Sequence, residues 1–292
     1  MQLCVLGAGT MGNGIAQVSA MAGHDVVLRD VEAAVVEDGL ASIRETLREG
    51  VDVGKVTEAE RAATLDRIEG ETALEPAVSD ADLVVEAVPE DLDLKRDVFE
   101  TVEAHVSGDA VLATNTSSLS VTAIAAAVDG PGRVLGLHFF NPPHIMELVE
   151  VVVAERTTDE TRAFGEEFVE SIDRTAVTVT DSPGFASSRL GVTLGVEAIR
   201  MVQEGVAGVE DVDAAMELGY NHPMGPLELT DHVGLDVRLD VLEYLREELG
   251  ERFRPPQLLK RKVRAGNLGR KTGEGFYVWQ DGDPVGVSGG DR

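Results

Sequence analysis

A glycine turn near the start of the chain constrains its fold more than any other stretch. The apolar run Gln2-Leu3-Cys4-Val5-Leu6 leads into Gly7-Ala8-Gly9-Thr10-Met11-Gly12, and a helical pattern of apolar residues follows. We expect Gly7 to form a tight turn, Gly9 to let the backbone approach a phosphate, and Gly12 to let the helix pack close to the strand. Free amides at the start of such a helix, at Thr10 and Met11, attract an anion. The order of strand, glycine turn and helix therefore predicts a dinucleotide site.

A second predicted strand, from His24 to Asp30, ends in an acid. In dinucleotide-binding folds an acid at this place accepts hydrogen bonds from the adenosine ribose and repels a 2′-phosphate. Asp30 therefore favours NAD over NADP, and the neighbouring Arg29 is the one feature that leaves NADP open. The alternative interpretation is a glycine-rich turn followed by a solvated acid.

The charge of the chain limits its partners. Its 292 residues carry a formal net charge of −28, and arginine outnumbers lysine twenty to five. Such a chain repels nucleic acid and anionic membranes. About 1 M salt shortens the Debye length to roughly 3 Å and screens this repulsion, so we hypothesise a very salty cytoplasm. The alternative is an ordinary acidic protein.

The remaining composition predicts a soluble cytoplasmic protein. Apolar runs are too short to cross a membrane, and a strand that starts at residue 2 leaves no room for a signal peptide. The single cysteine, Cys4, excludes an internal disulfide and a thiolate metal cluster. The six histidines are not arranged at metal-ligand spacing, so no metal site is expected.

Strands and helices alternate through the first 180 residues or so, which is typical of an α/β fold with a doubly wound, mostly parallel sheet of the Rossmann type. Two successive helical patterns after Asp30, the second opened by a capping box at Thr57, indicate an inserted helical hairpin. From residue 184 to about 278 the pattern is helical. We therefore predict two domains, 1–182 for NAD and 183–292 as an all-helical substrate and dimerisation domain, with a frayed tail from Gln280.

Polar residues gather where the later strands of the first domain end. Asn115 and Ser117 follow one strand, His138 and Asn141 close the next, and Glu150 lies in the strand after that. Open parallel sheets bind their ligands at strand ends. An alcohol that loses hydride must also lose its hydroxyl proton, and histidine is the natural base near pH 7. A carboxylate behind the imidazole fixes its tautomer, and a serine hydroxyl can donate to a developing oxyanion.

Taken alone, these residues allow a second interpretation. A histidine such as His138 in an apolar strand is more often a hydrogen-bonded core residue than a base, and Glu150 is more often a solvated charge at a strand end. Spacing along the chain does not show whether the two side chains touch.

Several motifs follow one another in order from residue 1 to about 279. They are Gly7 to Gly12, Val88-Pro89-Glu90, Asn115-Thr116-Ser117-Ser118-Leu119, His138-Phe139-Phe140-Asn141-Pro142, Leu148-Val149-Glu150, Ser182-Pro183-Gly184-Phe185, Gly225-Pro226-Leu227-Glu228-Leu229 and Gly269 to Tyr277. Together they resemble those of the L-3-hydroxyacyl-CoA dehydrogenases, in particular the short-chain 3-hydroxybutyryl-CoA type.

The resemblance implies a reaction and a site. It implies hydride transfer between NAD and (S)-3-hydroxyacyl-CoA, with His138 as base in oxidation and acid in reduction and Glu150 as its partner. It implies that Ser117 binds the substrate oxygen, that Asn141 lies near nicotinamide and substrate, and that the helical domain forms a homodimer. Contacts to NAD are implied for Asp30, Glu90, Lys95, Asn115 and, from the second domain, Lys271.

Two departures from the family pattern affect the substrate. The family often has Asn, which helps to orient the substrate, where this chain has Ser188; the shorter side chain suggests a water-mediated contact. Relatives often carry several lysines in the helical hairpin that bind the CoA phosphates, whereas in the corresponding stretch from Arg48 to Lys55 only these two residues are basic. Lys55 is the residue of this stretch that we expect to contact the substrate. A basic stretch from Arg252 to Gly273, which includes Lys260 and Lys262, is either an anion contact or a solvated helix face.

Two other functions stay open on the sequence. An enzyme of the same fold that acts on a free hydroxy acid or a sugar acid such as gulonate is compatible with the lysine-poor hairpin. The second is a non-catalytic protein that senses NAD. This function is disfavoured by the presence of a complete set of candidate catalytic residues, Ser117, His138 and Glu150. Acyl chain length and physiological direction are not predicted.

Overall fold

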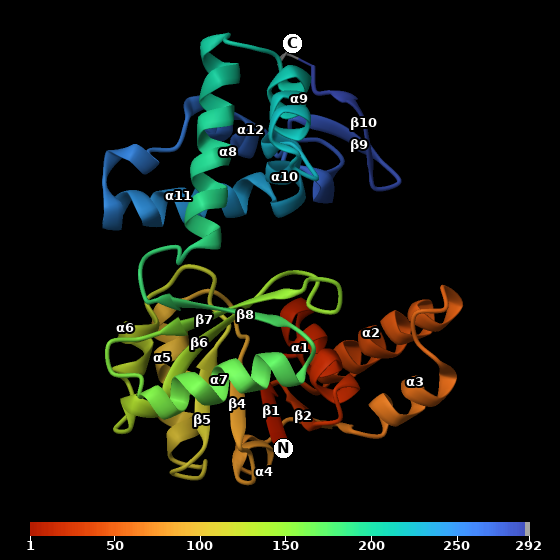
Figure 1. The fold of residues 1–292 in the computed structure, drawn as a ribbon, viewed down its shortest axis with the longest axis vertical. Coiled ribbons are helices and arrows are strands. Elements are labelled where there is room, and N and C mark those ends of the chain that lie inside the picture. The colour runs from red at the N-terminus through yellow and green to blue at the C-terminus, as the bar shows by residue number, and fades with distance from the viewer. Residues whose placement is uncertain (290–292) are drawn as a thin grey trace. The chain divides into compact units, whose positions relative to one another are not determined.

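The computed structural model describes residues 1–289, which divide into two compact units. The first unit is Met1–Ser182 and the second starts at Pro183. Each unit is described by itself (Figure 1). Among the described residues, no helix has the length and apolar character that a membrane crossing requires.

The first unit is built on one sheet of eight strands in the order β3-β2-β1-β4-β5-β6-β7-β8. All neighbouring strands are parallel except β6 and β7, which are antiparallel. The strands are β1 (Gln2–Leu6), β2 (Asp25–Arg29), β3 (Ile68–Glu71), β4 (Leu83–Glu86), β5 (Val111–Thr114), β6 (Val134–Phe139), β7 (Leu148–Val153) and β8 (Thr175–Thr180). This arrangement confirms the predicted fold class.

Helices connect these strands, and α7 crosses the sheet in Figure 1. The predicted hairpin is formed by the second and third helices, and the Thr57 capping box is present: its side chain accepts from the backbone of Glu60, and the Glu60 side chain reaches back to the amide of Thr57. The helices of this unit are α1 (Thr10–Met21), α2 (Ala33–Asp52), α3 (Glu58–Leu65), α4 (Leu74–Val78), α5 (Leu92–Glu103), α6 (Val121–Ala125), a 3-10 turn η1 (Pro131–Arg133) and α7 (Asp159–Ser171).

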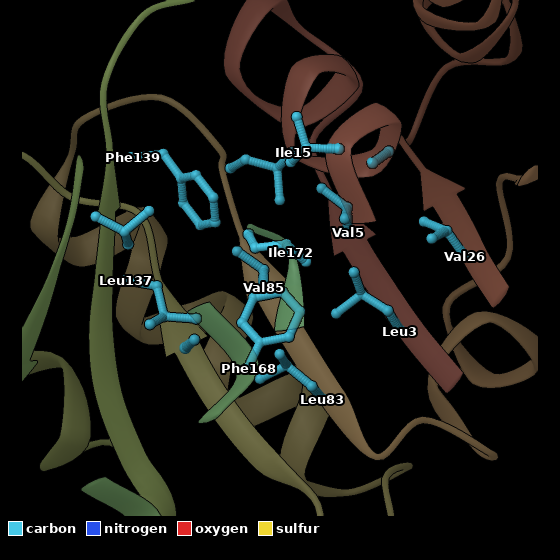
Figure 2. Packing of buried hydrophobic residues seen from close by; sticks show 14 of the residues in the cluster. Leu3, Val5, Ile15, Val26, Leu83, Val85, Leu137, Phe139, Phe168 and Ile172 are labelled. Atoms are coloured by element: carbon cyan, nitrogen blue, oxygen red, sulfur yellow. The ribbon is translucent and has the colours of Figure 1, made fainter. Parts of the chain in front are cut away.

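Both faces of the central strands are buried, and alternate residues serve alternate faces. On one face the strand side chains pack with those of α1, α2 and α7. Figure 2 shows this cluster around residues that include Leu3, Val5, Ile15, Leu83, Val85, Leu137 and Phe168. The intervening residues therefore point to the opposite face, and these include Glu86 on β4, Thr114 on β5 and His138 on β6.

One strand of this unit was not anticipated. The residues after the predicted hairpin were not assigned to a strand, but Ile68 starts β3, which pairs with the outer edge of β2. Edge strands have one unpaired side, and β3 holds two glutamates and a glycine in four residues. A short polar edge strand lacks the apolar run by which the other strands were predicted.

The second unit is mainly helical. Its longest helix ends at Gly205, which has the left-handed conformation (φ 73°) expected of a residue that ends a helix. The helices are α8 (Ser187–Glu204), α9 (Val209–Tyr220), α10 (Pro226–Val233), α11 (Leu235–Leu249) and α12 (Gln257–Ala265), with 3-10 turns η2 (Glu251–Phe253) and η3 (Arg270–Thr272).

The prediction of a frayed tail from Gln280 was wrong for the described part of that segment. Residues there form an antiparallel hairpin of β9 (Tyr277–Gln280) and β10 (Asp283–Val287), and residues 290–292 lie outside the described part. Tyr277 and Trp279 are buried and anchor the hairpin in the core of this unit. Asp281 and Gly282, which lie in this predicted tail, have the positive φ angles of a tight turn.

A buried carboxylate holds the segment that leads into this hairpin. Asp231 is 1% exposed and accepts hydrogen bonds from the amides of Phe276 and Tyr277 and from the indole of Trp279, at 2.8 to 2.9 Å. A Cβ at Gly275 would overlap this carboxylate. Burial raises the pKa of Asp231, and the three donors offset this cost of holding the ionised group. The contacts with Asp231 thus explain why glycine stands at position 275 and why Phe276 and Tyr277 are held in place behind it.

We expect the substitution Asp231→Ala to lower the free energy of unfolding by about 3 kcal/mol, because three buried donors lose their acceptor. Glu247→Ala, at an exposed position on α11, is the control and should change it by less than about 0.5 kcal/mol. Chemical denaturation measures both. An Asp231→Ala protein as stable as the control variant would contradict this account of the motif.

Candidate active site

The glycine turn after β1 has the geometry that was predicted for it. Gly7 has a positive φ of 99°, and a Cβ there would lie 2.6 Å from the carbonyl oxygen of Ala87. A Cβ at Gly12 would overlap the carbonyl of Gly7, whereas no heavy atom lies within 4 Å of a Cβ placed on Gly9. Two of the glycines are therefore needed by the fold itself. Gly9 leaves open space in front of the turn.

The start of α1 and the end of β2 meet at this turn. No side chain caps α1, so amides of its first turn, at Thr10 and Met11, have no side-chain acceptor at the cap. Asp30 accepts from the amide of Ala8 at 2.9 Å and from that of Val31 at 2.7 Å, one bond to each carboxylate oxygen. Each oxygen keeps a further lone pair for a ribose hydroxyl. Turn, helix start and acid together fit a dinucleotide.

His138 and Glu150 face each other across the only antiparallel pair of the eight-stranded sheet. The two residues are register partners in β6 and β7. The Nδ1 atom of His138 lies 2.7 Å from Oε2 of Glu150, and both residues are buried. The ring of Phe140 lies 4.5 Å from the imidazole, centre to centre. The contact that spacing along the chain left open is therefore present.

The loop after β5 is tied to its neighbours by side chains from the predicted motifs. Asn115 accepts a hydrogen bond from the amide of Phe139 through Oδ1, at 2.9 Å, which links the ends of β5 and β6. Oε1 of Glu90 accepts from Thr116 Oγ1 at 2.6 Å, from the amide of Ser117 at 3.0 Å and from Ser117 Oγ at 3.3 Å. Ser117 is thus held in the loop next to the strand of the histidine.

The structure places Lys95 differently from the direct cofactor contact that the resemblance implied. Its side chain is 1% exposed, and Nζ pairs with Glu86 at 2.7 Å and lies 3.5 Å from Glu90. Lys95 is therefore enclosed in protein and reaches the site through Glu90. Glu86 was not predicted, although an acid at the end of the buried run Leu83-Val84-Val85 was a signal for it.

Other predicted residues lie at separate places. Asn141 is exposed in the loop after β6, and Ser188 lies in the first turn of α8 in the second unit. Lys271 Nζ lies 2.6 Å from both carboxylate oxygens of Asp236.

The basic stretch from Arg252 to Gly273 is not one anion site. Lys262 is buried, and its Nζ donates to the carbonyl of Gly275 at 2.7 Å. Lys260 pairs with Glu243 at 3.0 Å. The interpretation of Lys262 as an anion contact was wrong, because its ammonium group is used inside its own unit.

A cavity of about 670 Å³ lies within the first unit, between α1, the inserted hairpin and the loop that follows Asn141. Lys55 lines it, and so do Glu49, His144 and Arg174. The Arg174 guanidinium donates to the carbonyls of Pro143 and His144, so it also fixes the loop that forms one wall. The hairpin lysine predicted to meet the substrate therefore faces a hollow large enough for part of a ligand.

Two family models match the chain. The description of the first is 3-hydroxyacyl-CoA dehydrogenase, NAD binding domain, over residues 2–182, and that of the second is 3-hydroxyacyl-CoA dehydrogenase, C-terminal domain, over residues 184–279.

Individual relatives agree with these matches. The chain is 44% identical to a probable 3-hydroxybutyryl-CoA dehydrogenase of Deinococcus radiodurans, over 96% of this chain and 100% of that one. It is 44% identical to a 3-hydroxybutyryl-CoA dehydrogenase of Bradyrhizobium diazoefficiens, over 96% of each. The solved structure of (S)-3-hydroxybutyryl-CoA dehydrogenase from Ralstonia eutropha superposes with a TM-score of 0.92, at 40% identity, over 96% of this chain and 99% of that one. The chain belongs to the 3-hydroxyacyl-CoA dehydrogenase family.

Proposed function

We propose that the chain is an NAD-dependent dehydrogenase that interconverts (S)-3-hydroxyacyl-CoA and 3-oxoacyl-CoA, with 3-hydroxybutyryl-CoA as its most suitable substrate. The observation that carries the proposal is the buried contact between His138 and Glu150, next to the strand end that holds Ser117. The names of the relatives support the substrate class.

In this mechanism the imidazole moves one proton. In the oxidation, Nε2 of His138 takes the hydroxyl proton from the substrate while the C3 hydrogen leaves as hydride; in the reduction both return. Bound NAD supplies the hydride acceptor. Because Nδ1 is bonded to Glu150, that carboxylate holds the tautomer with the proton on Nδ1 and stabilises the imidazolium that forms. Ser117 donates a hydrogen bond to the substrate oxygen as negative charge develops there, and keeps its own proton.

The cofactor is held by the glycine turn, Thr10, Met11 and Asp30, with Glu90 and Asn115 at the neighbouring strand ends. The single bond that each Asp30 oxygen makes within the protein supports ribose recognition and hence NAD. Asn141, Ser188 and Lys271 are proposed, from the resemblance alone, as contacts to substrate or cofactor.

An assay of NADH oxidation at high salt tests the function. We expect turnover with acetoacetyl-CoA and none with free acetoacetate. The substitution His138→Gln should lower kcat by about 10²- to 10⁴-fold, because the base is lost. His105→Gln, at an exposed position, is the control and should have no effect. Turnover of the free acid only would indicate the hydroxy acid enzyme, and NADH binding without turnover would indicate a sensor.

The CoA part of the substrate is proposed to bind along the hairpin, at the cavity that Lys55 lines. Charge reversal by Lys55→Glu should raise KM for acetoacetyl-CoA about tenfold, an expected loss of about 1.4 kcal/mol of binding, and leave KM for NADH unchanged. Arg44→Glu is a matched control, because Arg44 is exposed on the same hairpin and does not line the cavity. Equal effects of both variants would show only a general influence of charge.

We further propose that the chain forms a homodimer through its second unit and requires high salt. Large apolar side chains are exposed there, among them Leu218 at 87%, Tyr220 at 75% and Leu190 at 71%. A second copy would cover them, but two chains of charge −28 repel each other in dilute buffer.

Salt should therefore control assembly and activity together. We expect a dimer with full activity at about 1 M KCl or above, where the Debye length is roughly 3 Å, and an inactive or dissociated protein at about 0.01 M, where it is roughly 30 Å. Sedimentation and the NADH assay at both salt concentrations measure this. Unchanged mass and activity in dilute buffer would contradict the salt requirement.

A further inference from the structure

A buried ion pair lies beneath the candidate site and has no role in the proposed chemistry. Glu86, at the end of β4, and Lys95, on α5, are each 1% exposed, and their charged groups lie 2.7 Å apart. The carboxylate also accepts from Thr114 Oγ1 and from the amide of Val88, each at 2.7 Å. Three elements, β4, β5 and α5, thus converge on Glu86.

A buried ion pair of this kind contributes little net stability to a fold. Removing two charges from water costs about as much as their attraction returns, and well-packed apolar residues often serve a core as well or better. The neighbours on this face of the sheet are apolar, among them Val84, Phe99 and Leu112. The pair therefore calls for an explanation other than packing.

In addition to its contact with Glu86, Lys95 contacts residues of the candidate site. Its Nζ donates to the carbonyl of Val88 at 3.2 Å and lies 3.5 Å from Oε2 of Glu90. The other oxygen of Glu90 holds the hydroxyl of Thr116 and both the amide and the hydroxyl of Ser117. A continuous chain of contacts thus runs from Glu86 through Lys95 and Glu90 to Ser117.

We propose that Glu86 and Lys95 are positioning residues, which fix the orientation of the Glu90 carboxylate and through it the hydroxyl of Ser117. This inference rests on the proposed function. Glu86 neutralises Lys95 and fixes the position of its ammonium group. Nζ therefore attracts one oxygen of Glu90, while the Glu90 carboxylate keeps its contacts with the loop after β5. The other oxygen stays on the amide of Ser117.

The same geometry prepares the Ser117 proton for the reaction. A serine hydroxyl has one proton to donate. Without substrate, that proton points to Glu90 over a long 3.3 Å bond, while the shorter amide bond at 3.0 Å keeps the residue in place. The hydroxyl can therefore turn to a substrate oxygen while the backbone of the loop stays fixed.

Three variants separate positioning from stability. Glu86→Gln leaves the Lys95 ammonium without its buried counter-charge, so we expect both a lower melting temperature and a kcat reduced by about 10- to 100-fold. The double variant Glu86→Gln/Lys95→Met removes both charges, so we expect most of the melting temperature to return but kcat to stay low. Glu103→Gln, at the Glu103–Arg133 ion pair of the same unit, is the control and should leave kcat unchanged.

Hydrogen exchange gives a readout that does not depend on the substrate. The amide of Ser117 should exchange faster in the double variant than in the parent chain, and at the parent rate in Glu103→Gln. If acetoacetyl-CoA is not turned over, the proposed function fails, but the exchange rate still tests the positioning. If kcat and the exchange rate of the Ser117 amide both return to the parent values in the double variant, together with the melting temperature, the inference is overturned.

A milder variant covers the case in which the double variant does not fold. Thr114→Val is nearly isosteric and removes one bond to Glu86 without touching Glu90 or Ser117. We expect it to fold, to speed exchange at Ser117 and to lower kcat several-fold. In a Ser117→Ala background the same change should have less than a twofold effect on kcat, because the two residues act through one chain of contacts. Full additivity of the two changes would also overturn the inference.

Discussion

The antiparallel pairing of β6 with β7 is the constraint on which the site depends. All other neighbouring strands of this sheet are parallel, and parallel strands require long crossovers. Here the chain turns back directly, so that His138 and Glu150 become partners across the ladder. Their side chains point to the same face of the sheet, and the carboxylate meets the imidazole at 2.7 Å. A shift of β7 by one residue would point Glu150 to the opposite face of the sheet, away from His138.

Alternation along the strands extends this argument to the neighbouring residues. Glu86 and Thr114 end β4 and β5, and His138 lies one residue before the end of the adjacent β6, all on the face opposite the cluster of Figure 2. One face of the sheet therefore supplies the apolar core with α1, α2 and α7, and the other supplies polar groups at the strand ends. The site thus forms where polar residues replace apolar ones near the ends of these strands, and it needs no additional loop.

Much of the fold could be predicted because its signals are local, whereas the roles of the site residues were assigned from their place at strand ends and from the family resemblance. Apolar runs marked the central strands, and the glycine turn marked the start of α1. The 2.7 Å contact of His138 with Glu150 could not be predicted by physical reasoning, because it depends on register between strands. Lys95 was assigned to the cofactor from the resemblance alone, because no local pattern shows that its ammonium group pairs with Glu86 inside the protein. The strand β3 and the hairpin after Gln280 were missed because polar residues and Gly-Asp turns resemble loops.

Buried carboxylates repeat one pattern in both units. Glu86 and Asp231 are each 1% exposed, and each accepts hydrogen bonds from three donors at 2.7 to 2.9 Å. Asp213 likewise accepts from two amides at the start of α10 and from the hydroxyl of Tyr277. These buried acids thus each accept several hydrogen bonds within the protein, while the many exposed acids give the chain its negative surface.

The most direct test of the account is the tautomer of His138, which nitrogen-15 NMR of the labelled protein measures. With Nδ1 bonded to Glu150, the account predicts a protonated Nδ1 and an unprotonated Nε2 for the neutral imidazole. In a Glu150→Gln variant this preference should be weakened. A proton on Nε2 of the neutral ring in the unsubstituted chain would contradict the assignment of His138 as the group that takes the substrate proton.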